Sequence, residues 1–188
     1  MNEKLLPQEW PADAVFTRGH STLPIERFIA VLQTFGIERL VDIRAVPRSG
    51  HNPQFNSEAL AYALKQENIT YVALQVLGGL RRAQKDSPNA GWRNESFRGC
   101  ADYMQSDEFQ EGLKSLIDMS REERVAIMYA EAVPWRCHRW LVADALAIRD
   151  IPVVEILPEE RYRMHKLTPF ARVEDRQITY PAQQESLQ

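Results

Sequence analysis

Short apolar runs alternate with segments of helical periodicity along this chain, and this alternation constrains the fold more than any other feature. Five runs have the length and composition of buried strands, at residues 14–18, 40–44, 69–74, 125–129 and 153–157. Between them, apolar residues recur at helical spacing in residues 25–35, 57–66, 109–117 and 136–149. Strands that alternate with helices predict a mainly parallel sheet with helices on both faces. The expected fold is therefore a three-layer, Rossmann-like α/β domain.

The same pattern sets the expected boundaries of the domain. The residues before the first run, 1–13, are predicted to be an N-terminal extension. Residues 172–180 alternate enough between polar and apolar side chains to predict a small hairpin. Residues 181–188 are mostly polar and are predicted to form a flexible tail. A single domain over residues 14–180 accounts for the rest of the chain.

Composition excludes several classes of protein. At 188 residues and 44% hydrophobic content, the chain is long enough for one domain with a sizeable core. A net charge of -3 argues against a protein that coats polyanions by bulk charge. The N-terminal residues lack the pattern of a signal peptide, and no apolar run approaches the roughly 20 residues that span a bilayer. Because two cysteines are also too few for a disulfide framework, we expect a cytoplasmic protein without a membrane segment.

Arginine is concentrated at one edge of the predicted sheet. The chain has 23 basic residues, of which 18 are arginines, and the planar arginine side chain suits phosphate and carboxylate groups. Nine of the 18 follow predicted strands: Arg18, Arg44, Arg48, Arg81, Arg82, Arg93, Arg98, Arg136 and Arg139. In a parallel sheet these segments meet at the carboxyl ends of the strands, where ligands bind. The clustering predicts an anionic ligand at that edge, although a compositional bias would give the same total of arginines.

The start of the predicted helix 136–149 carries an unusual set of side chains. Its first turn reads Arg136-Cys137-His138-Arg139. A helix N-terminus is itself positive and favours anions, so three potential cations there imply a negative partner. That partner is either Glu131, just after the preceding strand, or a bound anionic ligand. Substrate binding is therefore assigned to Arg44, Arg48, Arg136, Cys137, His138 and Arg139.

Three residues at the same edge are candidates for catalysis. His20 follows the first strand and acts either as an acid, base or ligand or as a residue that fixes its loop. Asp42 lies two residues before Arg44, so the two share a face and form a structural ion pair or part of the site. Glu131 follows a buried strand and is the preferred general acid or base. Cys137 beside several cations is expected to favour the thiolate, which makes a nucleophile conceivable, but a structural, part-buried cysteine is the preferred role.

Residues 77–99 form a predicted loop of unusual length. A loop of this length in a compact domain is usually functional or disordered. Basic side chains are interleaved there with two aromatic residues, a mixture that suits stacking on bases and contact with phosphates. The alternative is a surface loop whose aromatic side chains pack down as anchors. If the loop binds nucleic acid, the residues involved are Arg81, Arg82, Trp92, Arg93 and Arg98.

The sequence predicts neither a cofactor nor a metal. It has no glycine-rich dinucleotide motif after the first strand and no Walker-type phosphate loop. The possible ligands lack the close paired spacing of a zinc site, and the neighbouring arginines oppose a cation: His20, Asp42, Glu131, Cys137 and His138. The patterns do not determine the oligomeric state.

Several segments resemble one family. They read FTRGHST (16–22), LVDIRAVPRSGHNPQFN (40–56), YVALQVLGGLR (71–81), SFRGCADYMQSDEF (96–109), the block from 130 to 139, and HKLTPFARV in the tail. In these segments the chain resembles the family catalogued as domain of unknown function 488. This family has no established activity. The resemblance implies matching positions at His20, Asp42, Arg44, Glu131, Cys137, His138 and Arg139. Similar sequences often carry a second cysteine where this chain has Tyr129, so a mechanism that rests on two thiols is not expected.

Three functions are compatible with these observations. The preferred hypothesis is a hydrolase or lyase that acts on a phosphate-bearing substrate, either a nucleotide or a nucleic acid. In it the arginines neutralise the phosphate while Glu131 or His20 moves protons. The second is a non-catalytic nucleic-acid-binding module that uses residues 77–99. The third is a ligand-sensing or interaction domain whose polar residues brace the sheet edge.

Overall fold

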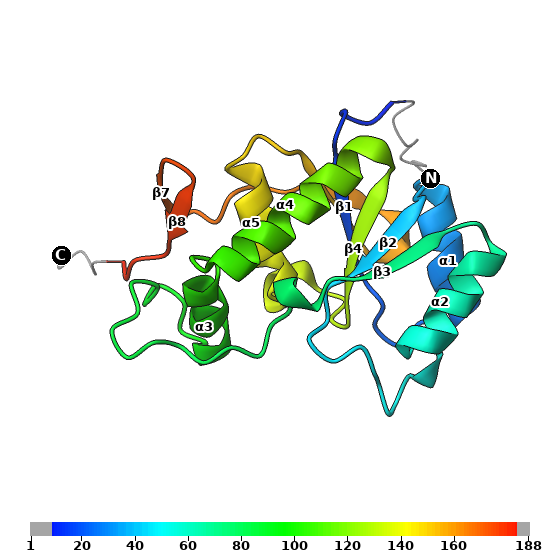
Figure 1. The fold of residues 1–188 in the computed structure, drawn as a ribbon, viewed down its shortest axis with the longest axis horizontal. Helices are drawn as coiled ribbons and strands as arrows, with labels where there is room; N and C mark the ends of the chain where they lie inside the picture. The colour runs from blue at the N-terminus through cyan, green and yellow to red at the C-terminus, as the bar shows by residue number, and fades with distance from the viewer. Residues whose placement is uncertain (1–8, 184–188) are drawn as a thin grey trace.

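A six-stranded sheet in the order β3-β2-β4-β1-β5-β6 forms the centre of the molecule (Figure 1). The structure is a computed structural model that describes residues 9–183, except for the side chain of Arg136. Five strands run parallel and lie where the sequence predicts them: β1 (Val15–Gly19), β2 (Arg39–Asp42), β3 (Thr70–Ala73), β4 (Val125–Tyr129) and β5 (Val153–Ile156). The predicted mainly parallel α/β fold is therefore confirmed.

Two short antiparallel pairings lie toward the C-terminus. Strand β6 (Tyr162–Met164) pairs with β5 and extends the sheet by one strand that the sequence pattern does not predict. Strands β7 (Arg172–Glu174) and β8 (Gln177–Thr179) form the small hairpin expected in residues 172–180. Figure 1 shows this hairpin away from the sheet, on the side of helix α3 (Glu95–Tyr103).

Helices cover both faces of the sheet. Helices α1 (Ile25–Thr34) and α2 (Ser57–Gln66) pack on one face, and α4 (Asp107–Glu122) and α5 (Arg139–Ala147) pack on the other. Successive strand residues point to opposite faces, so Val15 packs with α4 and α5 whereas Phe16 packs with α1. Four short 3₁₀ helices lie in the connections: η1 (Pro53–Phe55), η2 (Gln75–Leu77), η3 (Pro134–Arg136) and η4 (Pro158–Glu160). Within residues 9–183, no helix is both long and apolar enough to cross a membrane.

Helix α5 begins later than the sequence predicts. The expected first turn starts at Arg136, whereas the chain forms η3 up to Arg136 and α5 starts only at Arg139. Pro134 gives the physical reason, because its fixed φ angle favours the first position of a separate helical turn. Most residues of α5 are buried, as expected for a helix that is apolar on nearly all sides. They include a charged residue, Asp144.

The strand order places the loops after β1, β2 and β4 beside one another. Strand β4 lies between β2 and β1. The chain leaves β1 and β2 toward the face of α1 and α2, but it leaves β4 toward α5 on the opposite face. In open α/β sheets, ligands bind where the loops diverge in this way, at the carboxyl ends of the strands. The topology therefore gathers the predicted site residues at one edge.

Candidate functional site

Asp42 and Arg44 form a buried, bidentate ion pair at the end of β2. Arg44 Nε and Nη2 donate to Asp42 Oδ1 and Oδ2 at 2.9 and 2.7 Å. The hydroxyl of Tyr71 donates to Asp42 Oδ2 at 2.6 Å, and burial together with this hydrogen bond raises the pKa of Tyr71. Arg44 Nη2 also donates to the carbonyl oxygen of Phe55 at 2.7 Å. Both charges of the pair are therefore well partnered, and the pair ties the loop after β2 to β3.

His20 lies against this ion pair. Its Nε2 is 3.4 Å from Arg44 Nη1, and its Nδ1 is 2.7 Å from the carbonyl oxygen of Ser21. An arginine can only donate, so Nε2 accepts and Nδ1 carries the proton of a neutral imidazole. Burial lowers the pKa of His20, and the charge of Arg44 acts in the same direction. The ring stacks on Phe55 with centroids 4.2 Å apart, so one face and both ring nitrogens of His20 have partners in the protein.

Arg139 presents the opposite situation at the start of α5. Its side chain is 1% exposed, yet it makes one hydrogen bond, from Nη2 to the carbonyl oxygen of Ala132 at 3.0 Å. Among the described residues, Nε and Nη1 have no hydrogen-bond partner and no carboxylate lies within ion-pair distance. Burial lowers the pKa of the guanidinium, although Cys137 and Glu155 act to raise it. An unpaired buried charge is strongly unfavourable, so this guanidinium lacks the acceptors that it requires.

Arg18 is a second buried cation near Arg139. Its side chain is 6% exposed, Nη1 lies 3.4 Å from the carbonyl oxygen of Ile156, and Nε has no partner in the described part of the chain. Burial, and then the positive charge of Arg139, lowers the pKa of Arg18 to about 10. We call Arg18 and Arg139 together the arginine site. It offers three unpartnered nitrogen atoms to an acceptor.

The loop of residues 130–138 covers the arginine site. A Cβ atom on Gly19 would lie 1.8 Å from the carbonyl oxygen of Glu131 and 2.6 Å from Arg139 Nη1. Only a glycine lets the loop, β1 and the guanidinium approach one another so closely. The side chain of Glu131 is exposed, and its charge acts on the pKa of Arg139. The carboxylate of Glu131 is therefore close to the arginine site and accessible from solvent.

Cys137 and His138 lie in the core rather than at an open helix end. Cys137 is 2% exposed, and burial raises the pKa of its thiol to about 12. The expected thiolate is wrong, because desolvation outweighs the nearby charge of Arg139. Burial lowers the pKa of His138 to about 4, and its Nε2 donates to the carbonyl oxygen of Leu77 at 3.1 Å. His138 thereby ties the segment after β3 to the start of α5; the side chain of Arg136 lies outside the described residues.

The other predicted arginines lie along the edge without converging on the arginine site. Arg48 is exposed in the loop after β2. The guanidinium of Arg81 lies over the ring of Tyr103, 3.7 Å from its centroid, which is a cation–π contact. Two further side chains in this region are exposed to solvent: Arg82 and Arg93. The predicted loop also ends earlier than expected, because α3 starts before residue 99.

Trp92 serves as an anchor for this loop. Its ring lies 5.0, 4.9 and 5.3 Å from the rings of Phe97, Phe170 and Tyr180. Nη1 of Arg98 lies 3.4 Å from the carbonyl oxygen of Trp92. These contacts bind the loop to the C-terminal segment. They correspond to the alternative in which the aromatic residues pack down instead of forming an exposed stacking surface.

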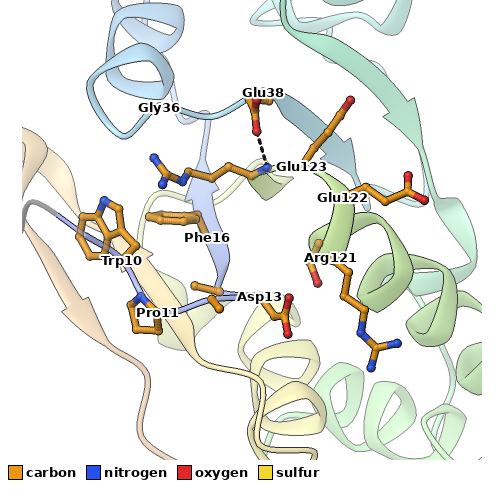
Figure 2. A pocket seen from close by; sticks show the side chains of 13 residues that line it. Trp10, Pro11, Asp13, Phe16, Gly36, Glu38, Arg121, Glu122 and Glu123 are labelled. Atoms are coloured by element: carbon orange, nitrogen blue, oxygen red, sulfur yellow. Dashed lines mark hydrogen bonds between the residues drawn. The ribbon is translucent and has the colours of Figure 1, made fainter.

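A hollow of about 470 Å³ lies at the opposite edge of the sheet, at the amino ends of the strands (Figure 2). Charged side chains surround it, among them Asp13, Glu38 and Arg121. A carboxylate oxygen of Glu38 accepts a hydrogen bond from the backbone N–H of Arg124 at 2.8 Å. None of the predicted site residues lines this hollow, so it is separate from the arginine site.

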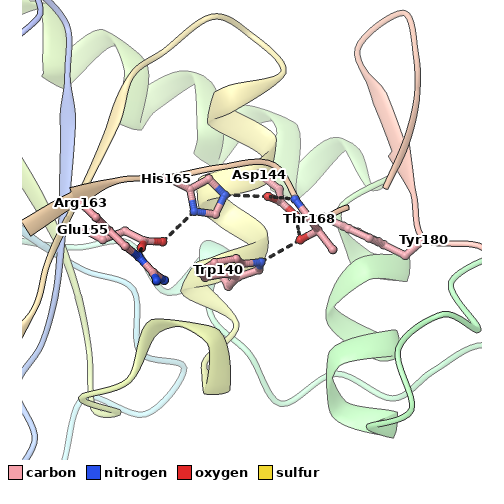
Figure 3. A network of polar contacts seen from close by, with 7 residues as sticks. All are labelled: Trp140, Asp144, Glu155, Arg163, His165, Thr168 and Tyr180. Atoms are coloured by element: carbon pink, nitrogen blue, oxygen red, sulfur yellow. Dashed lines mark hydrogen bonds and ion pairs between the residues drawn. The ribbon is translucent and has the colours of Figure 1, made fainter. Parts of the chain in front are cut away.

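A second buried polar cluster, none of whose residues is predicted from the sequence as part of a site, lies beside α5 (Figure 3). His165 Nε2 lies 2.7 Å from Asp144 Oδ1, and His165 Nδ1 lies 2.7 Å from Glu155 Oε1. The other oxygen of Glu155 pairs with Arg163. The second oxygen of Asp144 accepts hydrogen bonds from two hydroxyl groups, those of Thr168 and Tyr180. We call this set the α5 network: Asp144, Glu155, Arg163, His165, Thr168 and Tyr180.

The α5 network favours the protonated form of its histidine. Burial lowers the pKa of His165, but the hydrogen bonds to Asp144 and Glu155 outweigh it and raise the pKa above the ordinary value. For Glu155, burial raises the pKa, but the hydrogen bonds from His165 and Arg163 outweigh burial. The pKa of Glu155 is therefore below its ordinary value. A sequence signal for the network exists: Asp144 lies in an apolar helix and Glu155 in an apolar strand, and buried charges need partners. Among the described residues, no three His, Cys, Asp or Glu side chains are arranged as metal ligands.

Comparison with known families identifies the chain. The family model described as Domain of unknown function DUF488 matches residues 24–146, which is more than half of the sequence. The chain belongs to this family. Neither the curated proteins nor the solved structures contain a match.

The family match divides the candidate site. Residues 24–146 include β2, β3, β4 and most of α5, and therefore the Asp42–Arg44 pair, Glu131 and Arg139. Strand β1, with Arg18, precedes the matched region, and β5 and β6 follow it. The arginine site thus combines one residue from the matched region with one residue from outside it.

Proposed function

We propose that this chain is a hydrolase or lyase that acts on a phosphate-bearing substrate at the arginine site. The observation that carries the proposal is the guanidinium of Arg139, which is 1% exposed and has two nitrogen atoms without a partner among the described residues. A phosphate group supplies the negative charge and the acceptor oxygens that such a guanidinium lacks. Arg18 adds a second cation, and the N-terminus of α5 adds the partial positive charge of the helix.

Substrate entry requires the loop of residues 130–138 to move, because the guanidinium of Arg139 is covered. The bond that fastens this loop to Arg139 runs from Nη2 to the carbonyl oxygen of Ala132. A phosphate oxygen competes for the same N–H group. A hydrogen bond from a guanidinium to a charged phosphate is stronger than one to a neutral carbonyl, so phosphate binding and release of the loop are coupled.

Glu131 is the group available for proton transfer. Its side chain is exposed beside the arginine site, whereas the charge of Asp42 is satisfied by Arg44 and Tyr71. His20 is neutral, and both of its ring nitrogens have protein partners. In hydrolysis Glu131 accepts a proton from the attacking water; in a lyase reaction it accepts a proton from the substrate. His20 and Asp42 then hold the edge of the sheet, and the arginines neutralise the phosphate.

Thermal unfolding with inorganic phosphate, pyrophosphate and a panel of nucleotides tests the binding step. A ligand at a hundred times its Kd raises the free energy of unfolding by about 2.7 kcal/mol, and we expect Arg139→Ala to lose this stabilisation. Arg149→Ala is the matched control, because Arg149 follows the other end of α5 and donates to Ala145 and Gln110. Wild-type protein that is stabilised by none of these anions would rule out the proposed site.

Glu131→Gln tests the catalytic step separately. We expect this variant to keep the stabilisation by the bound ligand, because the phosphate contacts come from the arginines. Its turnover of that ligand should fall about 10²- to 10⁴-fold, the usual contribution of a general acid or base. The product is followed by chromatography of the reaction mixture. Undiminished turnover by this variant would exclude Glu131 as the acid or base.

The alternative is a non-catalytic nucleic-acid-binding or ligand-sensing domain. The exposed side chains of Arg82 and Arg93 favour nucleic-acid contact, and such contact is steeply dependent on salt. Oligonucleotide binding that weakens in the double variant Arg82→Ala, Arg93→Ala and is unchanged in Arg139→Ala would support this alternative. The opposite result would support the arginine site.

A further inference from the structure

Trp135 is an exposed tryptophan in the loop that covers the arginine site. It is 52% exposed, whereas tryptophan side chains are highly buried on average. It lies in η3, three residues after Ala132, whose carbonyl oxygen accepts from Arg139. Three residues span at most about 11 Å of chain. The indole ring therefore belongs to the same short segment as the carbonyl group that a ligand would replace on Arg139.

Arg163 fixes one face of this ring. Its guanidinium carbon lies 4.9 Å from the centroid of Trp135 and 5.5 Å from that of Trp140. The same guanidinium is ion-paired with Glu155 in the α5 network. Trp135 thus rests on a cation that is itself held by the core, a favourable cation–π arrangement. While the loop covers the arginine site, Arg163 orients this ring, and the exposed part of the ring is available for stacking.

Two further apolar side chains are exposed at the same edge of the sheet. Val46, after β2, is 58% exposed, and Leu80, after β3, is 72% exposed. Leu80 also has a φ angle of 64°, a left-handed conformation that is strained for a leucine. The edge therefore combines buried cations with exposed apolar side chains.

We infer that the substrate is a nucleoside phosphate, whose base stacks on Trp135 while its phosphate binds the arginine site. This inference rests on the proposed function and narrows its substrate class. Inorganic phosphate or a sugar phosphate satisfies Arg18 and Arg139 but makes no use of an oriented, exposed aromatic ring. A nucleoside phosphate carries a planar base and a phosphate on one sugar, so it engages both features. A free nucleotide and the terminal nucleotide of a nucleic acid share this chemistry.

Affinities of four kinds of ligand test the inference by calorimetric titration of the full chain. The ligands are inorganic phosphate, ribose 5-phosphate, the nucleoside 5′-monophosphates and short 5′-phosphorylated oligonucleotides. We expect nucleoside monophosphates to bind roughly tenfold more tightly than ribose 5-phosphate, as stacking of one base on an aromatic ring allows. Trp135→Ala should abolish this ratio and leave the affinity for ribose 5-phosphate unchanged. Trp135→Phe should keep most of it, and Tyr62→Ala, which removes a 70% exposed ring on α2, should keep all of it.

The outcomes separate this inference from the proposed function. Equal affinity of wild-type protein for ribose 5-phosphate and for nucleotides would overturn the stacking role and leave the phosphate site intact. An equal loss of both affinities in Trp135→Ala would also overturn it, since Trp135 would then support the loop. If no phosphate compound binds, the proposed function fails and the inference fails with it. Tighter binding of oligonucleotides than of mononucleotides would identify the terminal nucleotide of a nucleic acid as the source of the ligand.

Discussion

The α5 network and the arginine site are two buried clusters of charge that each include a residue of helix α5, Asp144 and Arg139 respectively, and they differ in how their charges are paired. In the network, His165 bridges Asp144 and Glu155 at 2.7 Å on each side. In the arginine site, Arg18 and Arg139 have no carboxylate partner among the described residues. Exposure does not explain the difference, because the side chains of both clusters are nearly all buried.

We expect the difference to separate a cluster whose charges the fold tolerates from one that reduces the stability of the fold. A buried charge with a well-placed opposite charge and hydrogen bonds is tolerated, whereas an unpaired one is strongly unfavourable. Strain and unsatisfied groups of this kind are characteristic of binding sites, where a ligand completes the arrangement. The α5 network is complete in the protein alone. In the arginine site, three guanidinium nitrogens have no partner among the described residues.

The largest effect is expected from Asp144→Asn, which tests whether the α5 network stabilises the fold. Asp144 accepts hydrogen bonds from His165, Thr168 and Tyr180, so removing its charge leaves the His165 imidazolium poorly compensated. We expect the free energy of unfolding in urea to fall by about 3–5 kcal/mol. Asp118→Asn, which removes a surface pair with Lys114, is the control and should leave the urea midpoint unchanged. A small effect of Asp144→Asn would remove the contrast between the two clusters.

Replacing two arginines, one from each kind of environment, is expected to change the free energy of unfolding by smaller amounts and in opposite directions. Arg44→Met leaves Asp42 buried without its partner, and we expect the free energy of unfolding to fall by about 3 kcal/mol. Arg139→Met removes an unpaired buried charge and keeps an apolar side chain of similar length. We expect it to raise the free energy of unfolding without ligand by on the order of 1 kcal/mol. Urea titrations in buffer free of phosphate and sulfate measure both, and a loss of stability in Arg139→Met would assign Arg139 a structural role.

The sequence was sufficient to predict the elements that have a strong pattern of their own. Strand β4 is an uninterrupted apolar run, which is typical of a strand buried on both faces. Strand β6 has three residues, too few for any periodicity. Helix α3 contains Glu95, Ser96, Arg98 and Gly99, so its apolar residues form no clear stripe within a stretch that resembles a loop. Both elements depend on tertiary contacts, which local composition does not encode.

The sequence predicts where the candidate site lies, but it does not predict which of the charged side chains there form ion pairs. The spacing of Asp42 and Arg44 on one strand indicates an ion pair, and the structure contains it. Arg139 also follows a strand and has an acid, Glu131, before it in the sequence. Only the fold shows that one is paired and the other is not. The contacts of His165 span 21 residues to Asp144 and 10 residues to Glu155, and no local pattern links these positions.

The smallest effect is a pH dependence that identifies His165 as the charged centre of the α5 network. The pKa of His165 is raised by its partners above the ordinary value of about 6.5. The native state therefore binds more protons than the unfolded state between pH 6.5 and the raised pKa. The stabilisation by His165 is complete below pH 6.5, and it is lost as the pH rises through the raised pKa, at up to about 1.4 kcal/mol per pH unit. The pKa values of His20 and His138 are lowered, so these side chains resist protonation in the folded state. They reduce the free energy of unfolding as the pH falls below 6.5.

We thus expect the free energy of unfolding to be greatest near pH 6.5 and to decline on both sides. Urea titrations from pH 5 to pH 9 measure this profile, and His165→Gln should abolish the decline on the alkaline side. Because that variant is expected to be less stable, the ¹⁵N shifts of the His165 ring in wild-type protein provide an independent measurement. Two protonated ring nitrogens at pH 7 are expected for an imidazolium between Asp144 and Glu155. A neutral His165 ring at pH 7 would mean that Asp144 has no cationic partner in the α5 network. The network would then differ from the arginine site in its hydrogen bonds alone.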